Sequence, residues 1–389
     1  MEQTVKRVMR LAPVMGITRV ANVTGLDNIG IPVVMVCRPN SRSLAVSQGK
    51  GVDLMSARAS GLMEATELYH AETITLPLRL ATYEELRYQH KLAEPRKLAR
   101  MVDSRFHPNL RLLWAEGRNL LNDETVLVPY ETVHTNFTIP SPEGHGCFNA
   151  TSNGLASGNH LLEAITHGLC ELVERDATTL WKFRGEERLT IGRVDLSSIT
   201  DPTCQELLSK FEVANTKVGI WNVTTEINLP VFVCYLLEGE GNESWYSAKV
   251  AAGFGCHPSR AVALTRDLTE AAQSRLTIVS GSRDDFGNEA YDPCSDQSLL
   301  EAIATAADAQ VHTNFHDVPN FEGDTLEADL EWELRCVKNA GFDQVIVVDL
   351  SRKEFGIPVV RVIVPGLEAM IVPGYVPGQR GQAILEVPT

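Results

Sequence analysis

TSNGLASGNHLLEAITHGLCELVERDA, residues 151–177, joins a glycine-rich turn directly to an amphipathic helix. The first half is rich in glycine, serine and asparagine, which let the backbone turn sharply. The second half carries leucine and isoleucine at helical spacing, which predicts a helix over 160–178 with Asn159 placed to cap it. The sequence therefore predicts a tight turn that leads into a partly buried helix.

The predicted helix carries acidic side chains on one face. At about 100° per residue, Glu163 and Glu174 fall within about 20° of each other, and Glu171 and Arg175 lie to one side of them. Carboxylates crowded together repel one another unless a cation offsets them, and Mg²⁺ prefers oxygen ligands beside substrate phosphates. For a single helix, solvated surface glutamates are the simpler interpretation.

Two further predicted helices carry the same kind of residue. The helix over 56–72 places Glu64 and Glu67 one turn apart, and the helix over 260–278 places Arg266 and Glu270 one turn apart. Taken alone, the second pair is typical of a surface ion pair. Each helix follows a glycine-bearing segment, QGKG or AAGFG. Three such helices together favour a carboxylate site for a metal-bound polyphosphate.

These motifs, in this order, resemble the YcaO family of ATP-dependent enzymes that activate backbone amides of peptides. The resemblance covers nearly the whole chain, from GITRVANVTGLDNIGIPVV through SNGLASGN, ELVERDA and LTRDLTEAAQSR to VVRVIVPGLE. It implies a YcaO-like fold, with ATP and Mg²⁺ as cofactors. Position by position, it implies a nucleotide site of Ser60, Glu64, Glu67, Asn159, Glu163, Glu171, Glu174, Arg175, Arg266 and Glu270. Within that set, Mg²⁺ is expected on Glu64, Glu67, Glu171 and Glu174, and no catalytic base is assigned.

Three apolar runs, at 30–39, 229–238 and 356–366, predict strands, and each has a proline near its start. With the helices between them, they predict a mixed α/β (α+β) fold in which helices cover the sheets. An N-terminal segment over 1–55 is expected to pack on a catalytic domain over 56–389. The polar segment at 280–297 and the SPEGHGCFN segment that precedes the central turn are predicted to be loops.

Composition excludes several classes of protein. The net charge of −15 argues against a nucleic-acid partner. No apolar run reaches transmembrane length, so a cytoplasmic protein without a membrane partner is expected. GxxxxGK[ST] is absent, which excludes a P-loop. The eight cysteines form no CxxC pair, so they are expected to be thiols rather than zinc ligands or disulfides.

The resemblance implies that an amide oxygen is phosphorylated by ATP and that the attacking nucleophile decides the product. A Cys, Ser or Thr side chain of the peptide gives an azoline, and external sulfide gives a thioamide. The stretch PGYVPGQRG and a tail without PxPxP are similar to the TfuA-associated subgroup, which favours thioamide formation with a TfuA-like sulfur-delivery partner. An azoline-forming cyclodehydratase and a non-catalytic peptide-binding accessory subunit remain as alternatives. A peptide or protein substrate and a homodimer are also implied.

Overall fold

The structure is a computed structural model that describes residues 1–239, 250–283, 297–308, 313–369 and 371–386. The chain divides into two compact units. Unit 1 comprises Met1–Ala65 and Gly185–Glu322, and unit 2 comprises Thr66–Arg184 and Gly323–Thr389. The predicted division into 1–55 and 56–389 stays a prediction.

Unit 1 contains two antiparallel sheets of three strands each. Their strands, in spatial order, are β1 (Arg19–Asn22), β2 (Val33–Cys37) and β3 (Val46–Lys50), then β10 (Thr216–Asn222), β11 (Val231–Glu238) and β12 (Val250–Cys256). The helices of this unit are α1 (Glu2–Met15), the first part of α2 (Leu54–Glu72), α5 (Pro202–Val213), α6 (Arg260–Ser280) and α7 (Gln297–Asp308). Two of the predicted strands are therefore confirmed as β2 and β11. The proline before each, Pro32 or Pro230, lies just outside the strand, where no ladder donor is lost.

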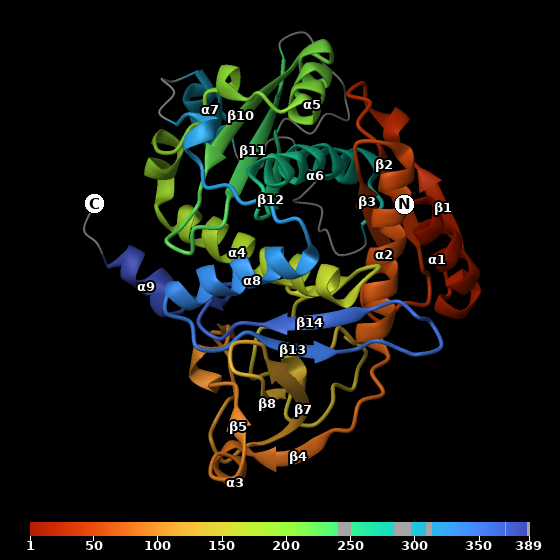
Figure 1. Cartoon of the computed structure of the whole chain (residues 1–389), viewed down its shortest axis with the longest axis vertical. Coiled ribbons are helices and arrows are strands. Elements are labelled where there is room, and N and C mark those ends of the chain that lie inside the picture. The colour runs from red at the N-terminus through yellow and green to blue at the C-terminus, as the bar shows by residue number, and fades with distance from the viewer. Residues whose placement is uncertain (240–249, 284–296, 309–312, 370, 387–389) are drawn as a thin grey trace. The chain divides into compact units, whose positions relative to one another are not determined.

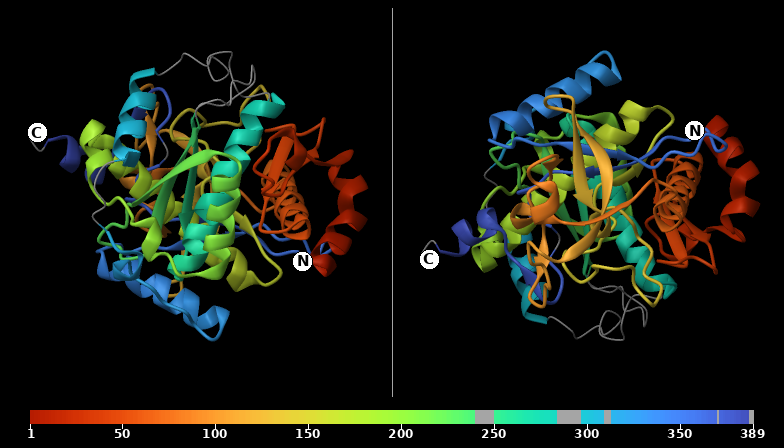
Figure 2. Two further views of the ribbon diagram at one scale, coloured as in Figure 1. Left: turned by 90° about the horizontal axis from the view of Figure 1, so that it is seen from above. Right: turned by 90° about the horizontal axis from the view of Figure 1, so that it is seen from below.

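Helix α6 lies along the second sheet of unit 1, and Figure 2 shows it beside the three strands. The close approach depends on glycine in β12. A Cβ atom at Gly253 would overlap the carbonyl oxygen of Asp267 and the amide nitrogen of Ala271, both in α6. The AAGFG segment is thus a packing surface for the helix that follows it.

Unit 2 is built on a seven-stranded sheet. The main path of the sheet runs β5 (Lys91–Leu92), β8 (Glu124–Pro129), β7 (Arg111–Asn119), β13 (Ile346–Asp349), β14 (Val359–Ile363) and β9 (Leu155–Ser157), and β4 (Arg79–Thr82) also pairs with β7. A separate pair joins β6 (Arg100–Met101) to β15 (Tyr375–Val376). The helices are the rest of α2, α3 (Tyr83–Leu86), α4 (Leu161–Phe183), α8 (Leu326–Asn339) and α9 (Gln379–Leu385).

Helix α4 packs on β14 and β9, with α8 beside it, and Figure 1 shows both helices next to β13 and β14. The predicted helix is confirmed, but its first turn differs from the prediction. The helix begins at Leu161, and its N-cap is His160, whose imidazole accepts the Leu162 N–H at 3.3 Å. The prediction that Asn159 is the cap was wrong, because the helix starts one residue later and the Asn159 N–H is donated to Glu163 instead.

The mixed α/β class is confirmed, with helices packed on sheets in both units. The predicted loop at 280–297 falls largely outside the described residues. Every cysteine that the structure describes is a free thiol, and all of these except Cys37 are buried. In the described parts of the chain, no helix combines the length and apolar character needed to cross a membrane.

Gly253→Ala is expected to destabilise unit 1, because the new methyl group must push α6 away from β12. Overpacking of this kind costs about 1–3 kcal/mol, which urea unfolding measures directly. Gly25→Ala is the matched control, since a Cβ atom there meets nothing within 4 Å. Equal stability of the two variants would contradict this account of how α6 packs.

Candidate functional site

Three glutamates of unit 2 bind the backbone of one short segment, the turn segment Gly154–Asn159. Glu171 of α4 accepts the Gly154 N–H at 2.9 Å, and Glu163 of the same helix accepts the Asn159 N–H at 2.9 Å. Glu67 of α2 accepts both the N–H of Ser157, at 2.9 Å, and its hydroxyl, at 2.7 Å. Carboxylates bound in this way have fixed positions, because their donors belong to the main chain.

The turn segment is itself held by β14. The Val362 N–H donates to the Gly154 carbonyl at 2.7 Å, and β9 pairs with β14 from Leu155 to Ser157. Gly154 has a φ of +78°, and a Cβ atom there would overlap the Val362 carbonyl oxygen. Only glycine fits both the left-handed backbone and the close approach of the strand. The sheet therefore sets where the three glutamates lie.

Arg175 lies between the last two glutamates of α4. Its guanidinium is 3.8 Å from Glu171 and 3.4 Å from Glu174. The Glu174 side chain is only 9% exposed, and that of Arg175 only 17%. These are not solvated surface residues, so the simpler interpretation of the helix fails for them. A guanidinium this close offsets the negative charge of the carboxylates beside it.

The remaining predicted residues belong to unit 1 or to the first part of α2. Glu64 accepts the Gln48 N–H from β3 at 3.3 Å, and Glu270 of α6 forms an ion pair with Lys50 at the end of the same strand. Arg266 donates to the Cys256 carbonyl at 3.3 Å. Ser60 is half-buried on α2. Glu64 and Glu270 thus both contact β3.

Arg361 of β14 is a residue of this region to which the sequence assigned no role. It is 3% exposed, and its Nη2 donates to the Thr151 carbonyl at 2.6 Å. Burial lowers the pKa of its guanidinium to about 10, and the charge of Glu171 opposes this change. The available signal was a lone charged residue in the apolar run VVRVIV. A charge in such a run indicates an ionic partner across the sheet.

Two more residues were missed. Lys50 lies in the QGKG segment but was given no role, and its partner Glu270 lies 220 positions away in the sequence. Ser157 reads as an ordinary turn residue, although its N–H and hydroxyl both reach Glu67. Neither pairing is visible without the fold.

A second ionic cluster of unit 2 holds the chain near its C-terminus to α4. Asp176 is fully buried and accepts two hydrogen bonds from Arg380, each at 2.9 Å, as well as the Glu368 N–H at 2.9 Å. Burial raises the pKa of Asp176 to about 6, and the Arg380 charge opposes it. Glu368 in turn accepts the N–H groups of Gly378 and Gly381. The ELVERDA motif therefore contributes residues to the glutamate cluster and, through Asp176, binds the C-terminal segment.

The residues of each unit suit Mg²⁺ only as part of a larger ligand set. Among the described residues, no three acidic, histidine or cysteine side chains gather in a geometry that would hold a metal by themselves. Mg²⁺ typically takes one or two protein carboxylates and completes its octahedron with phosphate oxygens and water. Pairs such as Glu171 and Glu174 fit that requirement, so the donor chemistry matches a metal that arrives with a polyphosphate.

His134 of unit 2 is 1% exposed. Its Nδ1 accepts the Asn136 N–H at 3.0 Å, and its Nε2 contacts the Nε2 of His145. Burial, together with the charges of His145 and Arg361, lowers its pKa to about 4. The folded protein therefore keeps this imidazole neutral, whereas the unfolded chain binds a proton below the ordinary pKa of about 6.5. The contribution to stability is complete above about pH 6.5 and is lost as the pH falls to about 4.

His134→Asn keeps an acceptor for the Asn136 N–H but removes the titrating group, so its unfolding free energy is expected to fall less than that of the wild type between about pH 6.5 and about pH 4. Urea unfolding at a series of pH values measures the difference. His107→Asn is the control, because His107 makes the same type of bond, to the Asn109 N–H, but is exposed. If the wild type and His134→Asn lose stability in parallel, His134 is not held neutral by the fold.

A family described as YcaO cyclodehydratase, ATP- and Mg²⁺-binding, matches residues 48–368. The chain is 34% identical to an uncharacterized protein in the tfuA 3′ region of Rhizobium leguminosarum bv. trifolii, over 93% of this chain and 86% of that protein. It is also 32% identical to an uncharacterized protein of Methanothermobacter thermautotrophicus, over 95% of this chain and 94% of that protein. These relatives share nearly the full length of the chain.

Solved structures share the fold. A heterocyclase in complex with substrate and cofactor matches with a TM-score of 0.78 and 25% identity, over 95% of this chain and 52% of the heterocyclase. The chain thus spans about half the length of that protein. The YcaO structure from Methanopyrus kandleri bound with AMPPCP and Mg²⁺ matches with a TM-score of 0.72 and 23% identity, over 94% of this chain and 91% of that one. At this identity the second likeness concerns the fold alone.

Proposed function

Because the chain belongs to the YcaO family of ATP- and Mg²⁺-dependent peptide-modifying enzymes, we propose that it converts a backbone amide of a peptide or protein to a thioamide, with sulfur delivered by a TfuA-like partner. The observation that carries the nucleotide part is the set of glutamates fixed on the turn segment. The relative in a tfuA 3′ region supports the sulfur part. The stretch PGYVPGQRG also supports it.

We assign the nucleotide site to the ten residues that the family resemblance indicates. Glu64, Glu67, Glu171 and Glu174 would hold Mg²⁺, which when bound neutralises charge on the phosphates and orients them. Arg175 lies 3.8 Å from Glu171 and 3.4 Å from Glu174, so it would place a positive charge next to the phosphates that accompany the metal. Arg175 and Arg266 would neutralise the charge that develops on the transferred phosphoryl group. Ser60, Asn159, Glu163 and Glu270 complete the set.

The oxygen of an amide is a poor leaving group, and the reaction requires that it be converted to a good one. Sulfide forms a bond to the amide carbon, the amide oxygen takes the terminal phosphoryl group of ATP, and the carbon–oxygen bond then breaks to release phosphate. The products are the thioamide, ADP and phosphate, so sulfur replaces oxygen and no oxidant is required. In this scheme the side chains of this chain bind and orient ATP while the partner supplies the nucleophile. A cytoplasmic homodimer is part of the same proposal.

Glu174→Gln and Arg266→Ala are expected to weaken Mg²⁺-dependent ATP binding by at least about tenfold, because each removes a charge that under this assignment would face the metal or the phosphates. Calorimetric titration with ATP, with and without Mg²⁺, measures the effect. Glu212→Gln is the control, since Glu212 is an exposed residue of α5. Unchanged affinity in both site variants, with thermal unfolding like that of the wild type, would exclude this assignment.

The product distinguishes thioamide formation from its alternatives. We expect a protein or peptide of the native organism to show replacement of one backbone oxygen by sulfur, and to lose it when the gene is deleted or carries Glu174→Gln. Mass spectrometry of the proteome before and after complementation measures this. Loss of water in place of the exchange would mean an azoline-forming cyclodehydratase, and a modification that survives Glu174→Gln would mean a non-catalytic accessory subunit.

A further inference from the structure

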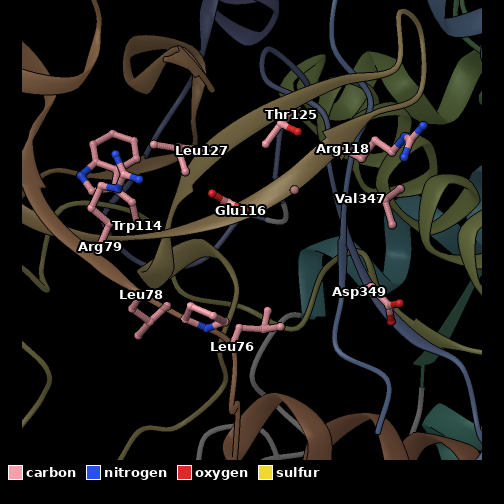
Figure 3. Close-up of a pocket in the computed structure, with 12 residues that line it drawn as sticks. Leu76, Leu78, Arg79, Trp114, Glu116, Arg118, Thr125, Leu127, Val347 and Asp349 are labelled. Carbon is pink, nitrogen blue, oxygen red and sulfur yellow. The ribbon is translucent and has the colours of Figure 1, made fainter. Parts of the chain in front are cut away.

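One face of the unit 2 sheet holds a pocket of about 510 Å³ that none of the residues discussed above occupies. Trp114 and Glu116 of β7, Leu127 of β8 and Val347 of β13 lie on it, and Leu78 borders it from the segment before β4. Figure 3 shows Glu116 in the middle of this lining, with Asp349 on the side opposite Trp114. The volume is within the range of ligand sites, about 300–1,000 Å³.

The edge of β7 is interrupted at this pocket. On one side β4 pairs with Arg111–Trp114, and on the same side β13 pairs with only Arg118 and Asn119. Residues 115–117 have no register partner on that edge among the described strands. Successive residues of a strand point their N–H and C=O groups to alternate edges, so at least one of these three presents both groups toward the gap. Gly117, which has no side chain, lines the pocket with its main chain.

Charges in the pocket are not balanced. Arg118 is neutralised by its ion pair with Asp123, whereas Arg79 donates to the imidazole of His90 at 2.6 Å and keeps its positive charge. Two carboxylates of the lining therefore face one uncompensated arginine. Glu116 and Asp349 have no ion-pair partner in the part of the chain that the structure describes, and both are exposed. Beneath them the floor is apolar, with Trp114 1%, Leu127 3% and Val347 8% exposed. Two carboxylates above an apolar floor complement a segment in which basic and apolar residues alternate.

We propose that this pocket, the β7 gap pocket, binds an extended basic segment of the peptide substrate as an added strand. The main chain of the peptide pairs with residues 115–117, its lysine or arginine side chains meet Glu116 and Asp349, and its apolar side chains lie on Trp114 and Leu127. The proposal rests on the proposed function, since an enzyme that modifies a peptide must hold one. It places peptide binding on unit 2, on residues distinct from the ten assigned to the nucleotide.

The test uses two short synthetic peptides, acetylated and amidated, one alternating valine with lysine and one alternating valine with glutamate. Fluorescence anisotropy of each labelled peptide with the full chain, without ATP or Mg²⁺, measures affinity. The lysine peptide is expected to bind and to weaken with added salt. Its affinity is expected to fall at least about tenfold in the double variant Glu116→Gln/Asp349→Asn. The control Glu327→Gln/Glu331→Gln removes two exposed carboxylates of α8 and is expected to bind as the wild type does.

A third peptide tests the strand geometry. Methylation of alternate amide nitrogens in the lysine peptide keeps its charges but removes main-chain donors, so it is expected to bind at least about tenfold more weakly. Equal binding of all three peptides, equal binding by the site and control double variants, or no binding by the wild type would each overturn the proposal. Self-association of the wild type that is lost in Glu116→Gln/Asp349→Asn would also overturn it, because a second copy would then cover the pocket.

ATP calorimetry on Glu116→Gln/Asp349→Asn separates this proposal from the proposed function. If this variant binds ATP with Mg²⁺ as the wild type does, its loss of peptide affinity concerns the peptide site alone.

Discussion

The N–H groups of the turn segment are the donors on which the glutamate cluster of unit 2 depends. Gly154, Ser157 and Asn159 each donate to a carboxylate, and their positions are set by β14 through the sheet. Hydrogen bonds to a charged acceptor contribute about 1.5–3 kcal/mol, more than bonds between neutral groups. The long, flexible side chain of each glutamate therefore takes its position from rigid backbone.

This constraint couples folding to the site. A glutamate that left its N–H donor would strand a polar main-chain group, at a cost of about 1–3 kcal/mol where that group is buried. Gly154 lies close against the Val362 carbonyl, so the turn segment cannot relax without disturbing β14. Further along α4, Asp176 fixes the same helix to Arg380 and Glu368. Helix α4 is thus held at its first turn by the turn segment and in its second half by the C-terminal segment.

The sequence predicted those elements whose signal is local. The apolar runs of β2, β11 and β14 and the periodic helices α2, α4 and α6 were all predicted, because each can be recognised within a few turns or one strand. The hairpin of β7 and β8 was not predicted. Glu116 and Arg118 interrupt its apolar pattern, and they do so on the face that forms the β7 gap pocket rather than the core. A strand that lines a pocket with both polar and apolar side chains no longer shows a simple alternation of polar and apolar residues.

The residues of the candidate site were likewise predictable only where their sequence signal is local. Crowded glutamates on a helix are a local feature, so spacing singled out Glu171, Glu174 and Arg175 as candidates, and the family resemblance supplied their predicted role. Lys50 and Arg361 escaped because their partners are 220 and 210 positions away, at Glu270 and Thr151. Both are cations that lie in strands and contact an acidic or carbonyl group from a distant helix or turn. A single sequence gives no measure of such distances.

Arg175 has a consequence for the order in which ligands bind at the assigned site. A guanidinium stays protonated at any physiological pH, so its positive charge persists next to Glu171 and Glu174 whether or not a metal is present. Free Mg²⁺ would add two positive charges beside it and meet repulsion. Mg²⁺ that arrives with ATP brings several negative charges, which the arginine attracts. At the assigned site, the residue that pairs with Glu171 and Glu174 would therefore favour the metal–nucleotide complex over the metal alone, and metal affinity would depend on the nucleotide.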